Sequence, residues 1–194
     1  VITSDDGKIA VVNVLNGQAV WRHELKTALN TGAGFDGKHV AVVTLNNELV
    51  LLQDGKVLWR NRLTSQSYTH PLVAGERVFM MMADRSVLAF DLATGVRLWM
   101  QQRPGEPLVL KQNGVLLAFQ NTLLVGLGGR LTAINPDNGQ FKWDVPIANP
   151  RGINDLERLV DLVAKPTRVA NSVCVRAFQS QVGCVDALRG SVLW

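Results

Sequence analysis

The sequence predicts an all-β protein, a β-propeller built from four-stranded blades. Three observations predict it: a repeat of about 40 residues, a tryptophan at one fixed place in each repeat, and short apolar strands separated by polar turns. All five tryptophans lie four residues after a glycine, and they are 38, 40, 44 and 51 residues apart. The pairs are Gly17 and Trp21, Gly55 and Trp59, Gly95 and Trp99, Gly139 and Trp143, and Gly190 and Trp194.

The repeats also share the residues that precede each glycine. The segments 89–95, 133–139 and 184–190 each place Asp or Asn four residues before the glycine. Asp and Asn favour turns, and glycine supplies the positive φ that such a turn needs. After the turn, apolar residues alternate with a period of two, which is typical of a strand. We expect each tryptophan to pack one sheet on the next, because a large apolar side chain repeated in every unit indicates architecture.

The repeats predict a single partial propeller over residues 1–194, with blades ending near the five tryptophans. The first unit begins inside its second strand, so about four and a half blades are expected. An open array of blades leaves unpaired sheet edges, and we therefore expect the chain to be a fragment of a larger ring. The widest tryptophan spacing contains an insertion at the rim, residues 149–166.

Composition limits the classes of partner that the protein can have. The formal net charge is +4, but Lys and Arg are scattered, which argues against nucleic acid as a partner. No apolar run is long enough to span a membrane, and residues 1–6 contain no signal peptide or lipid-attachment cysteine. Attachment to a membrane would therefore need a lipid anchor that this chain lacks.

Catalytic and metal-binding patterns are not recognisable. His23, His39 and His70 are spread along the chain without a nucleophile or metal ligands nearby. Cys174 and Cys184 flank a predicted hairpin, and two interpretations stay open, a pair of buried thiols or a cross-strand disulfide. The glycines of 126–129 precede a strand and predict a hairpin turn, whereas a phosphate loop would precede a helix.

Two segments are candidate docking loops. Residues 108–111 follow Pro104 and Pro107, and they form either an exposed apolar loop or the first strand of the next blade. Within the insertion, apolar residues recur near helical spacing over 153–162, which predicts a short amphipathic turn or helix. If this segment is helical, Arg158 and Asp161 can pair with each other.

With these two segments, the repeats resemble the BamB family of outer-membrane lipoproteins, components of the β-barrel assembly machinery of Gram-negative bacteria. The resemblance implies an eight-bladed ring on the periplasmic side of the outer membrane that docks to the periplasmic domains of the barrel-inserting subunit BamA. Unfolded outer-membrane proteins are a second class of partner that it allows. It implies neither a cofactor nor catalysis.

The resemblance also carries over residue by residue. Leu108 and Leu110 match the family's loop leucines, and Lys111 stands where an arginine is typical. Asp161 matches the first of two acidic residues, and Val163 replaces the second. The expected partner-binding residues are Leu108, Leu110, Lys111, Arg158, Leu159, Asp161 and Leu162.

Two other functions use the same repeat. A quinoprotein dehydrogenase needs a calcium site of oxygen ligands and a catalytic carboxylate, and no cluster in the sequence resembles such a site. A ligand-sensing propeller stays open, and the insertion favours the assembly factor over it. The sequence therefore predicts a non-catalytic, partner-binding scaffold.

Overall fold

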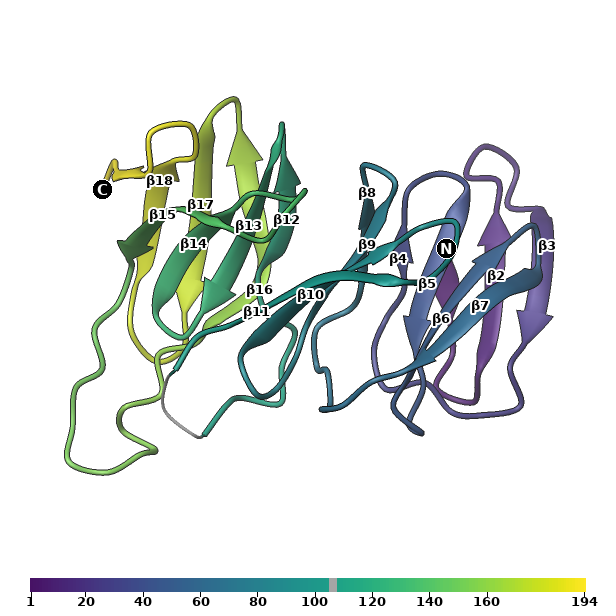
Figure 1. Cartoon of the computed structure of the whole chain (residues 1–194), viewed down its shortest axis with the longest axis horizontal. Helices are drawn as coiled ribbons and strands as arrows, with labels where there is room; N and C mark the ends of the chain where they lie inside the picture. The colour runs from purple at the N-terminus through teal and green to yellow at the C-terminus, as the bar shows by residue number, and fades with distance from the viewer. Residues whose placement is uncertain (105–107) are drawn as a thin grey trace. The chain divides into compact units, whose positions relative to one another are not determined.

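A computed structural model describes residues 1–104 and 108–194, and every regular element in this part is a β-strand (Figure 1). The strands form five sheets, four with four strands and one with three. Each sheet follows the order of the chain, so every strand pairs with its neighbours in sequence. Within the described residues, no helix is long and apolar enough to cross a membrane. The predicted all-β fold with four-stranded sheets is confirmed.

The strands have the following bounds. The first sheet contains β1 (Ile2–Thr3), β2 (Lys8–Val12) and β3 (Ala19–Glu24). The second contains β4 (Gly34–Phe35), β5 (His39–Val43), β6 (Glu48–Gln53) and β7 (Lys56–Arg62). The third contains β8 (Leu72–Ala74), β9 (Arg77–Met81), β10 (Ser86–Asp91) and β11 (Arg97–Gln102). The fourth contains β12 (Leu116–Phe119), β13 (Thr122–Leu127), β14 (Arg130–Ile134) and β15 (Phe141–Pro146). The fifth contains β16 (Leu162–Val169), β17 (Ser172–Ala177), β18 (Val182–Asp186) and β19 (Ser191–Val192).

The chain divides into two compact units, one of residues 1–82 and 88–98 and one of residues 83–87 and 99–194. In the first unit, the two central strands of the second sheet are buried on both faces. Val40 and Val42 pack in one cluster with Ile9, whereas Ala41 and Val43 pack in another with residues of β9. Because side chains alternate between the faces of a sheet, a strand covered on both sides must be apolar throughout.

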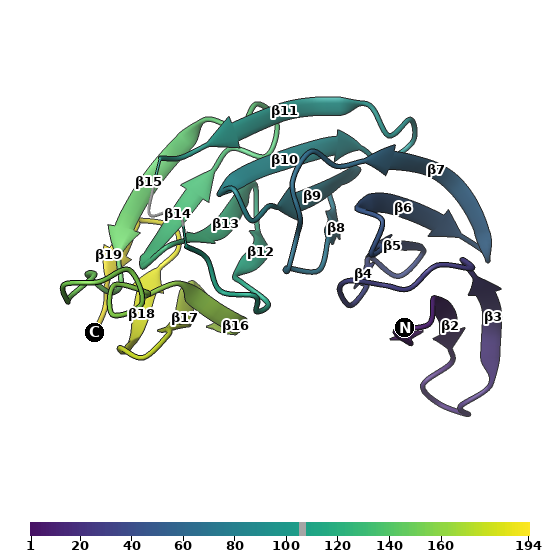
Figure 2. The same cartoon turned by 90° about the horizontal axis from the view of Figure 1, so that it is seen from below.

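The core of the second unit lies between the fourth and fifth sheets, which Figure 2 shows beside each other. Phe119, Leu124 and Val145 come from the fourth sheet, and Val173 and Val185 come from the fifth. All five side chains are buried. Packing between the faces of neighbouring sheets therefore supplies the apolar burial in this unit.

Four of the tryptophans pack against the glycine of the next repeat. A Cβ added at Gly95 would lie 2.7 Å from the indole of Trp59, and one added at Gly139 would lie 2.8 Å from that of Trp99. One added at Gly190 would lie 2.5 Å from the indole of Trp143, whereas one added at Gly55 would lie 3.6 Å from Trp21, an ordinary van der Waals distance. The indole nitrogens of Trp59 and Trp99 donate to the carbonyl oxygens of Leu92 and Pro136, at 2.8 and 2.9 Å. The expectation that these tryptophans join successive sheets is confirmed for these four contacts.

The structure of the turn explains why Asp or Asn stands four residues before the glycine. The Asp91 carboxylate accepts hydrogen bonds from the amide and hydroxyl of Thr94, and the amide of Gly95 donates to the carbonyl of Asp91. Gly95 has a φ of 73°, which glycine adopts without strain. The repeat around Gly55 differs, because Asp54 and Gly55 form a two-residue hairpin between Gln53 and Lys56. This shorter turn contributes to the shorter spacing before Trp59.

A β-bulge interrupts the expected alternation just before the tryptophan. In the first sheet, Trp21 pairs with Val11 and Ala19 pairs with Val12, so Val20 is an extra residue. Leu58 and Lys142 occupy the equivalent position in the second and fourth sheets. All three side chains are exposed. The two-residue period predicted through this stretch is therefore wrong at one residue, because a bulge shifts the register.

The two cysteines form a disulfide. Cys174 of β17 and Cys184 of β18 lie directly opposite each other, with their Cα atoms 4.0 Å apart. The backbone of Cys184 bonds to Leu193 and Trp194, on its other side. The cysteine pair is therefore a non-hydrogen-bonded one, the type of antiparallel position in which the side chains lie closest.

We predict that Gly95→Ala destabilises the protein more than Gly75→Ala does. Both glycines have positive φ, so each substitution costs about 1–2 kcal/mol in backbone strain. A Cβ at position 75 meets open space, whereas one at position 95 overlaps Trp59 and adds about 1–3 kcal/mol. Urea unfolding of the two variants measures the difference. Equal losses would show that the indole moves aside at no cost.

We predict that reducing the disulfide lowers the free energy of unfolding by about 2–3 kcal/mol, the value expected for a cross-link between residues 10 apart. Thermal unfolding with and without dithiothreitol checks this. The control is the double variant Cys174→Ala and Cys184→Ala, whose melting temperature should not respond to the reductant. A wild-type protein that is equally insensitive would contradict the prediction.

Candidate partner-binding surface

In the second unit, the candidate loops lie at one end of the sheets. Because consecutive strands alternate in direction, the hairpin between the second and third strands of a sheet is at the same end as the links to neighbouring sheets. The amide of Leu162 donates to the carbonyl of Gly128, and the amide of Phe178 donates to that of Asp161. The hairpins 127–130 and 177–182 therefore contact the segment that leads from the insertion into β16.

Residues 108–111 form a loop. No strand is present there, and the first strand of the fourth sheet begins at Leu116, so the interpretation of this segment as a strand is wrong. Leu108 is 42% exposed, Leu110 is half-buried and Lys111 is exposed. Residues 105–107, which include the predicted turn residue Pro107, lie outside the described residues.

The insertion contains a single turn. Figure 1 shows it as the long loop between β15 and β16 that extends away from the strand ends. The Asn154 side chain accepts a hydrogen bond from the amide of Glu157, and the Glu157 carboxylate accepts one from the amide of Ile153. This reciprocal pattern is close to a capping box, which starts a helical turn. The amide of Arg158 completes the turn by donating to the carbonyl of Asn154.

Two of the leucines expected to meet a partner are buried inside the chain. Leu159 is 5% exposed and Leu162 is 1% exposed, so the expectation that they are exposed is wrong. The helical pattern stops after one turn, because the chain then enters β16 and packs on the fourth sheet. A Cβ at Gly126 would lie 2.8 Å from that of Leu162. Ile153 and Leu156 are the apolar side chains that the insertion exposes.

Asp161 connects the insertion to the 108–111 loop. One carboxylate oxygen lies 3.2 Å from the Arg85 guanidinium, and the other accepts a hydrogen bond of 3.1 Å from the amide of Leu110. Arg85 in turn donates to the carbonyl oxygen of Leu108 at 3.1 Å. The side chains of Arg85 and Asp161 are only 12% and 14% exposed, so water screens this ion pair less than it screens a surface pair.

This network corrects the pairing expected from the sequence. The salt bridge of Asp161 is with Arg85, 76 residues earlier in the chain, in the turn between β9 and β10. Arg158 lies three residues before Asp161, but the turn ends before Asp161 and the two are not on consecutive turns of a helix. Val163, which the resemblance aligns with a second acidic residue, is buried and bridges to Gly114. Nothing in the sequence around Arg85 indicated its role.

The glycines at 126–129 form the predicted hairpin and also make room for the insertion. Gly128 and Gly129 are the two turn residues between β13 and β14. A Cβ at Gly129 would lie 2.2 Å from the carbonyl oxygen of Ala148, and the amides of Ile147 and Ala148 both donate to the Gly129 carbonyl. Glycine therefore permits close contact between this hairpin and the start of the insertion.

Two of the three histidines have close polar partners within the chain. The ring of His23 bonds to the carbonyl of Gly55, and that of His39 lies 2.9 Å from the Asp36 carboxylate. No group of three or more His, Cys, Asp or Glu side chains among the described residues is placed to hold a metal ion.

Comparison with known proteins identifies the family. The model of the outer membrane protein assembly factor BamB family matches residues 5–194. The BamB protein of Bordetella pertussis is 36% identical over 95% of this chain, and that of Burkholderia pseudomallei is 33% identical over 100% of it. These matches cover 48% and 51% of the two relatives, so the chain spans about half their length.

Solved structures agree with the fold. The crystal structure of BamB from Moraxella catarrhalis superimposes with a TM-score of 0.89, at 20% identity, covering 99% of this chain and 59% of the other. A quinohemoprotein alcohol dehydrogenase from Comamonas testosteroni gives a TM-score of 0.70 at 13% identity, covering 97% of this chain and 37% of the enzyme. At these identities the likeness concerns the β-propeller fold alone. The family model and the two relatives show more than the fold: this chain belongs to the family of the outer membrane protein assembly factor BamB.

Proposed function

We propose that the protein containing this chain is a non-catalytic scaffold of the outer-membrane β-barrel assembly machinery, and that it binds the periplasmic domains of BamA. Membership of the BamB family carries this proposal, since the relatives are named as outer membrane protein assembly factors. The likeness to an alcohol dehydrogenase is one of fold, and a shared fold does not carry a shared chemistry.

We further propose that the protein acts at the periplasmic face of the outer membrane. The disulfide between Cys174 and Cys184 supports an oxidising compartment, because such bonds persist in the periplasm and are rare in the cytosol. Unfolded outer-membrane proteins are a second class of ligand that this location offers.

The binding surface that we propose combines the 108–111 loop with the insertion. In this surface, Leu108 is an exposed apolar side chain and Leu110 is a half-buried one. Lys111 and Arg158 are exposed charged side chains. Ile153 and Leu156 are further exposed apolar side chains, and together they take the part expected of Leu159 and Leu162. Apolar anchors surrounded by polar and charged side chains are typical of such interfaces.

Asp161 contributes by positioning the loop. Its carboxylate holds the backbone of Leu110, and its partner Arg85 holds that of Leu108. A loop ordered before binding loses less conformational entropy when a partner docks. The scaffold therefore presents a preorganised surface, whose backbone is held by charged side chains that need not touch the partner.

We predict that Leu108→Asp weakens binding to purified BamA periplasmic domains by about tenfold or more, since burying a new carboxylate opposes docking. Leu188→Asp is the matched control. Leu188 is 52% exposed, against 42% for Leu108, and lies in the turn between β18 and β19 at the opposite end of its sheet. Calorimetric titration measures both affinities. Equal affinities for the two variants would exclude Leu108 from the interface.

We predict that Asp161→Asn frees the 108–111 loop without unfolding the protein. The neutral amide is a weaker acceptor than the carboxylate, so the hydrogen bond that the Leu110 amide donates weakens. The salt bridge with Arg85 is lost as well. Hydrogen exchange at that amide should accelerate by about tenfold or more, while the buried strands of the fourth sheet keep their protection. Unchanged exchange at Leu110 would remove Asp161 from this positioning role.

A further inference from the structure

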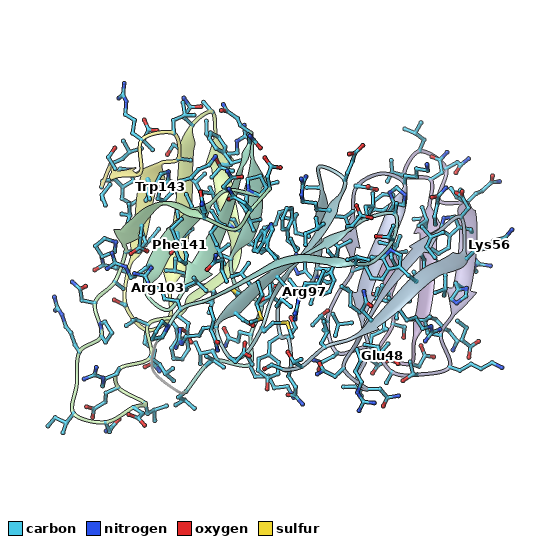
Figure 3. The ribbon with its side chains drawn as sticks, in the orientation of Figure 1. Glu48, Lys56, Arg97, Arg103, Phe141 and Trp143 are labelled. Atoms are coloured by element: carbon cyan, nitrogen blue, oxygen red, sulfur yellow. A yellow bond between two sulfur atoms is a disulfide. The ribbon has the colours of Figure 1, made fainter. Side chains whose placement is uncertain are left out.

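The first part of the insertion is an exposed loop with buried ends. Every residue from 149 to 158 is exposed. The pairs that flank this loop are buried, Ile147 with Ala148 and Leu159 with Val160. Figure 3 shows the loop below the labelled Arg103, with its side chains extending into solvent. The 149–158 loop therefore protrudes from the second unit between two apolar attachments.

Two polar side chains and a glycine set the shape of the turn in this loop. The Glu157 carboxylate accepts a hydrogen bond of 2.9 Å from the amide of Ile153, and the Asn154 side chain accepts one of 2.9 Å from the amide of Glu157. Gly152 has a φ of 123°, and a Cβ added there would lie 2.3 Å from the Cβ of Glu157. Glycine is therefore needed at position 152 for the turn to close.

The turn presents two large apolar side chains to solvent. Ile153 is 100% exposed and Leu156 is 65% exposed. Because hydrogen bonds close the chain between Ile153 and Glu157, the two apolar side chains share one small convex surface. The amide of the buried Leu159 donates to the carbonyl of Leu156, which attaches the turn to the body of the unit. The loop therefore holds an apolar pair in a defined place without burying it against the described residues.

The charges around this pair favour a protein as its partner. An anionic lipid surface attracts segments with an excess of basic residues, whereas the formal charge of residues 151–158 is zero, from two arginines and two carboxylates. Apolar side chains surrounded by polar and charged ones are typical of contacts with another protein. A convex loop fits a concave surface, which a folded domain offers and an unfolded chain does not.

The turn is continuous with the surface on which a partner is proposed to dock. Three residues after the loop, the Asp161 carboxylate accepts a hydrogen bond of 3.1 Å from the amide of Leu110. We propose that Ile153 and Leu156 insert together into an apolar groove of the folded partner that docks on the 108–111 loop, and that Glu157 is a positioning residue for this pair. This inference rests on the proposed function and adds the shape and chemistry of the surface that the partner offers.

The first experiment measures the affinity of the full-length protein for BamA periplasmic domains by calorimetric titration. The binding variant is Ile153→Ser with Leu156→Ser, and the control is Val14→Ser with Leu15→Ser, an exposed aliphatic pair in the turn between β2 and β3. We expect the binding variant to lose about tenfold or more in affinity and the control to bind like the wild type. The heat-capacity change of binding should become less negative for the binding variant, because less apolar surface is buried.

Two substitutions at Glu157 test its positioning role. Glu157→Ala removes the acceptor of the Ile153 amide and should weaken binding by about threefold to tenfold, because the loop must then be ordered as the partner docks. Glu157→Gln keeps a side-chain oxygen at this place and should restore most of the affinity. If Gln binds as weakly as Ala, the charge of Glu157 contacts the partner and the positioning role is wrong.

Labelling with a maleimide measures whether the pair is free before the partner binds. The cysteines of the described chain are joined in a disulfide, so Ile153→Cys adds a free thiol to it. In the full-length protein this thiol should react rapidly, and BamA periplasmic domains should slow the reaction. Slow labelling of the protein alone would show that another part of the same protein covers the turn, which would overturn the inference.

The outcomes separate the two proposals. Failure of the wild type to bind the BamA domains would overturn the proposed function, and this inference with it. Wild-type binding that the serine double variant retains in full would leave that function standing and overturn the apolar contact. Weaker binding of the double variant to an unfolded outer-membrane protein, with BamA binding unchanged, would also overturn it and assign the pair to an extended ligand.

Discussion

The contact between a tryptophan of one sheet and a glycine of the next is the constraint on which the remaining structure depends. The indole of Trp59 packs against Gly95, where a Cβ would leave no room, and its nitrogen donates to the carbonyl oxygen of Leu92 in the same turn. The contact therefore specifies both distance and orientation. It recurs at Gly139 and Gly190, where an added Cβ would also approach within 3 Å of an indole. Glycine has two roles at this position, since it also has the positive φ that its turn requires.

Sheets held in this way determine where their loops lie. In the second unit, the hairpins at 127–130 and 177–182 form hydrogen bonds with the insertion, or with the residues just before it, at one end of the strands. The carbonyl groups of Gly128, Gly129 and Asp161 accept these bonds. The 108–111 loop is then attached by the salt bridge of Arg85 with Asp161. The buried leucines of the insertion belong to this attachment, because Leu159 and Leu162 pack inward and leave Ile153 and Leu156 exposed. The strands, the salt bridge and its hydrogen bonds together hold the 108–111 loop in one conformation.

Charged side chains also connect the strands and links at this end of the sheets. Arg103 and Arg130 both bond to the carboxylate of Asp144, and Arg85 bonds to that of Asp161. These side chains are partly shielded from solvent, so water and salt screen the ion pairs less than they screen fully exposed ones.

What could be predicted from the sequence was local. The period of the Gly–Trp pairs, the strands between turns and the hairpin at 126–129 follow from side-chain alternation and turn chemistry, which act over a few residues. The family resemblance rested on these repeats with two short segments, and the family is confirmed. The exposed position of Leu108 also agrees with its sequence context.

The tertiary structure alone decided which residues meet. The bulge before Trp21, the register that joins Cys174 to Cys184, and the burial of Leu162 each depend on how strands pair and sheets pack. Arg85 meets Asp161 across 76 residues of sequence, and Arg103 meets Asp144 across 41. Periodicity determines which face a residue occupies within its own element. It carries no information on which distant element covers that face, and packing decides this.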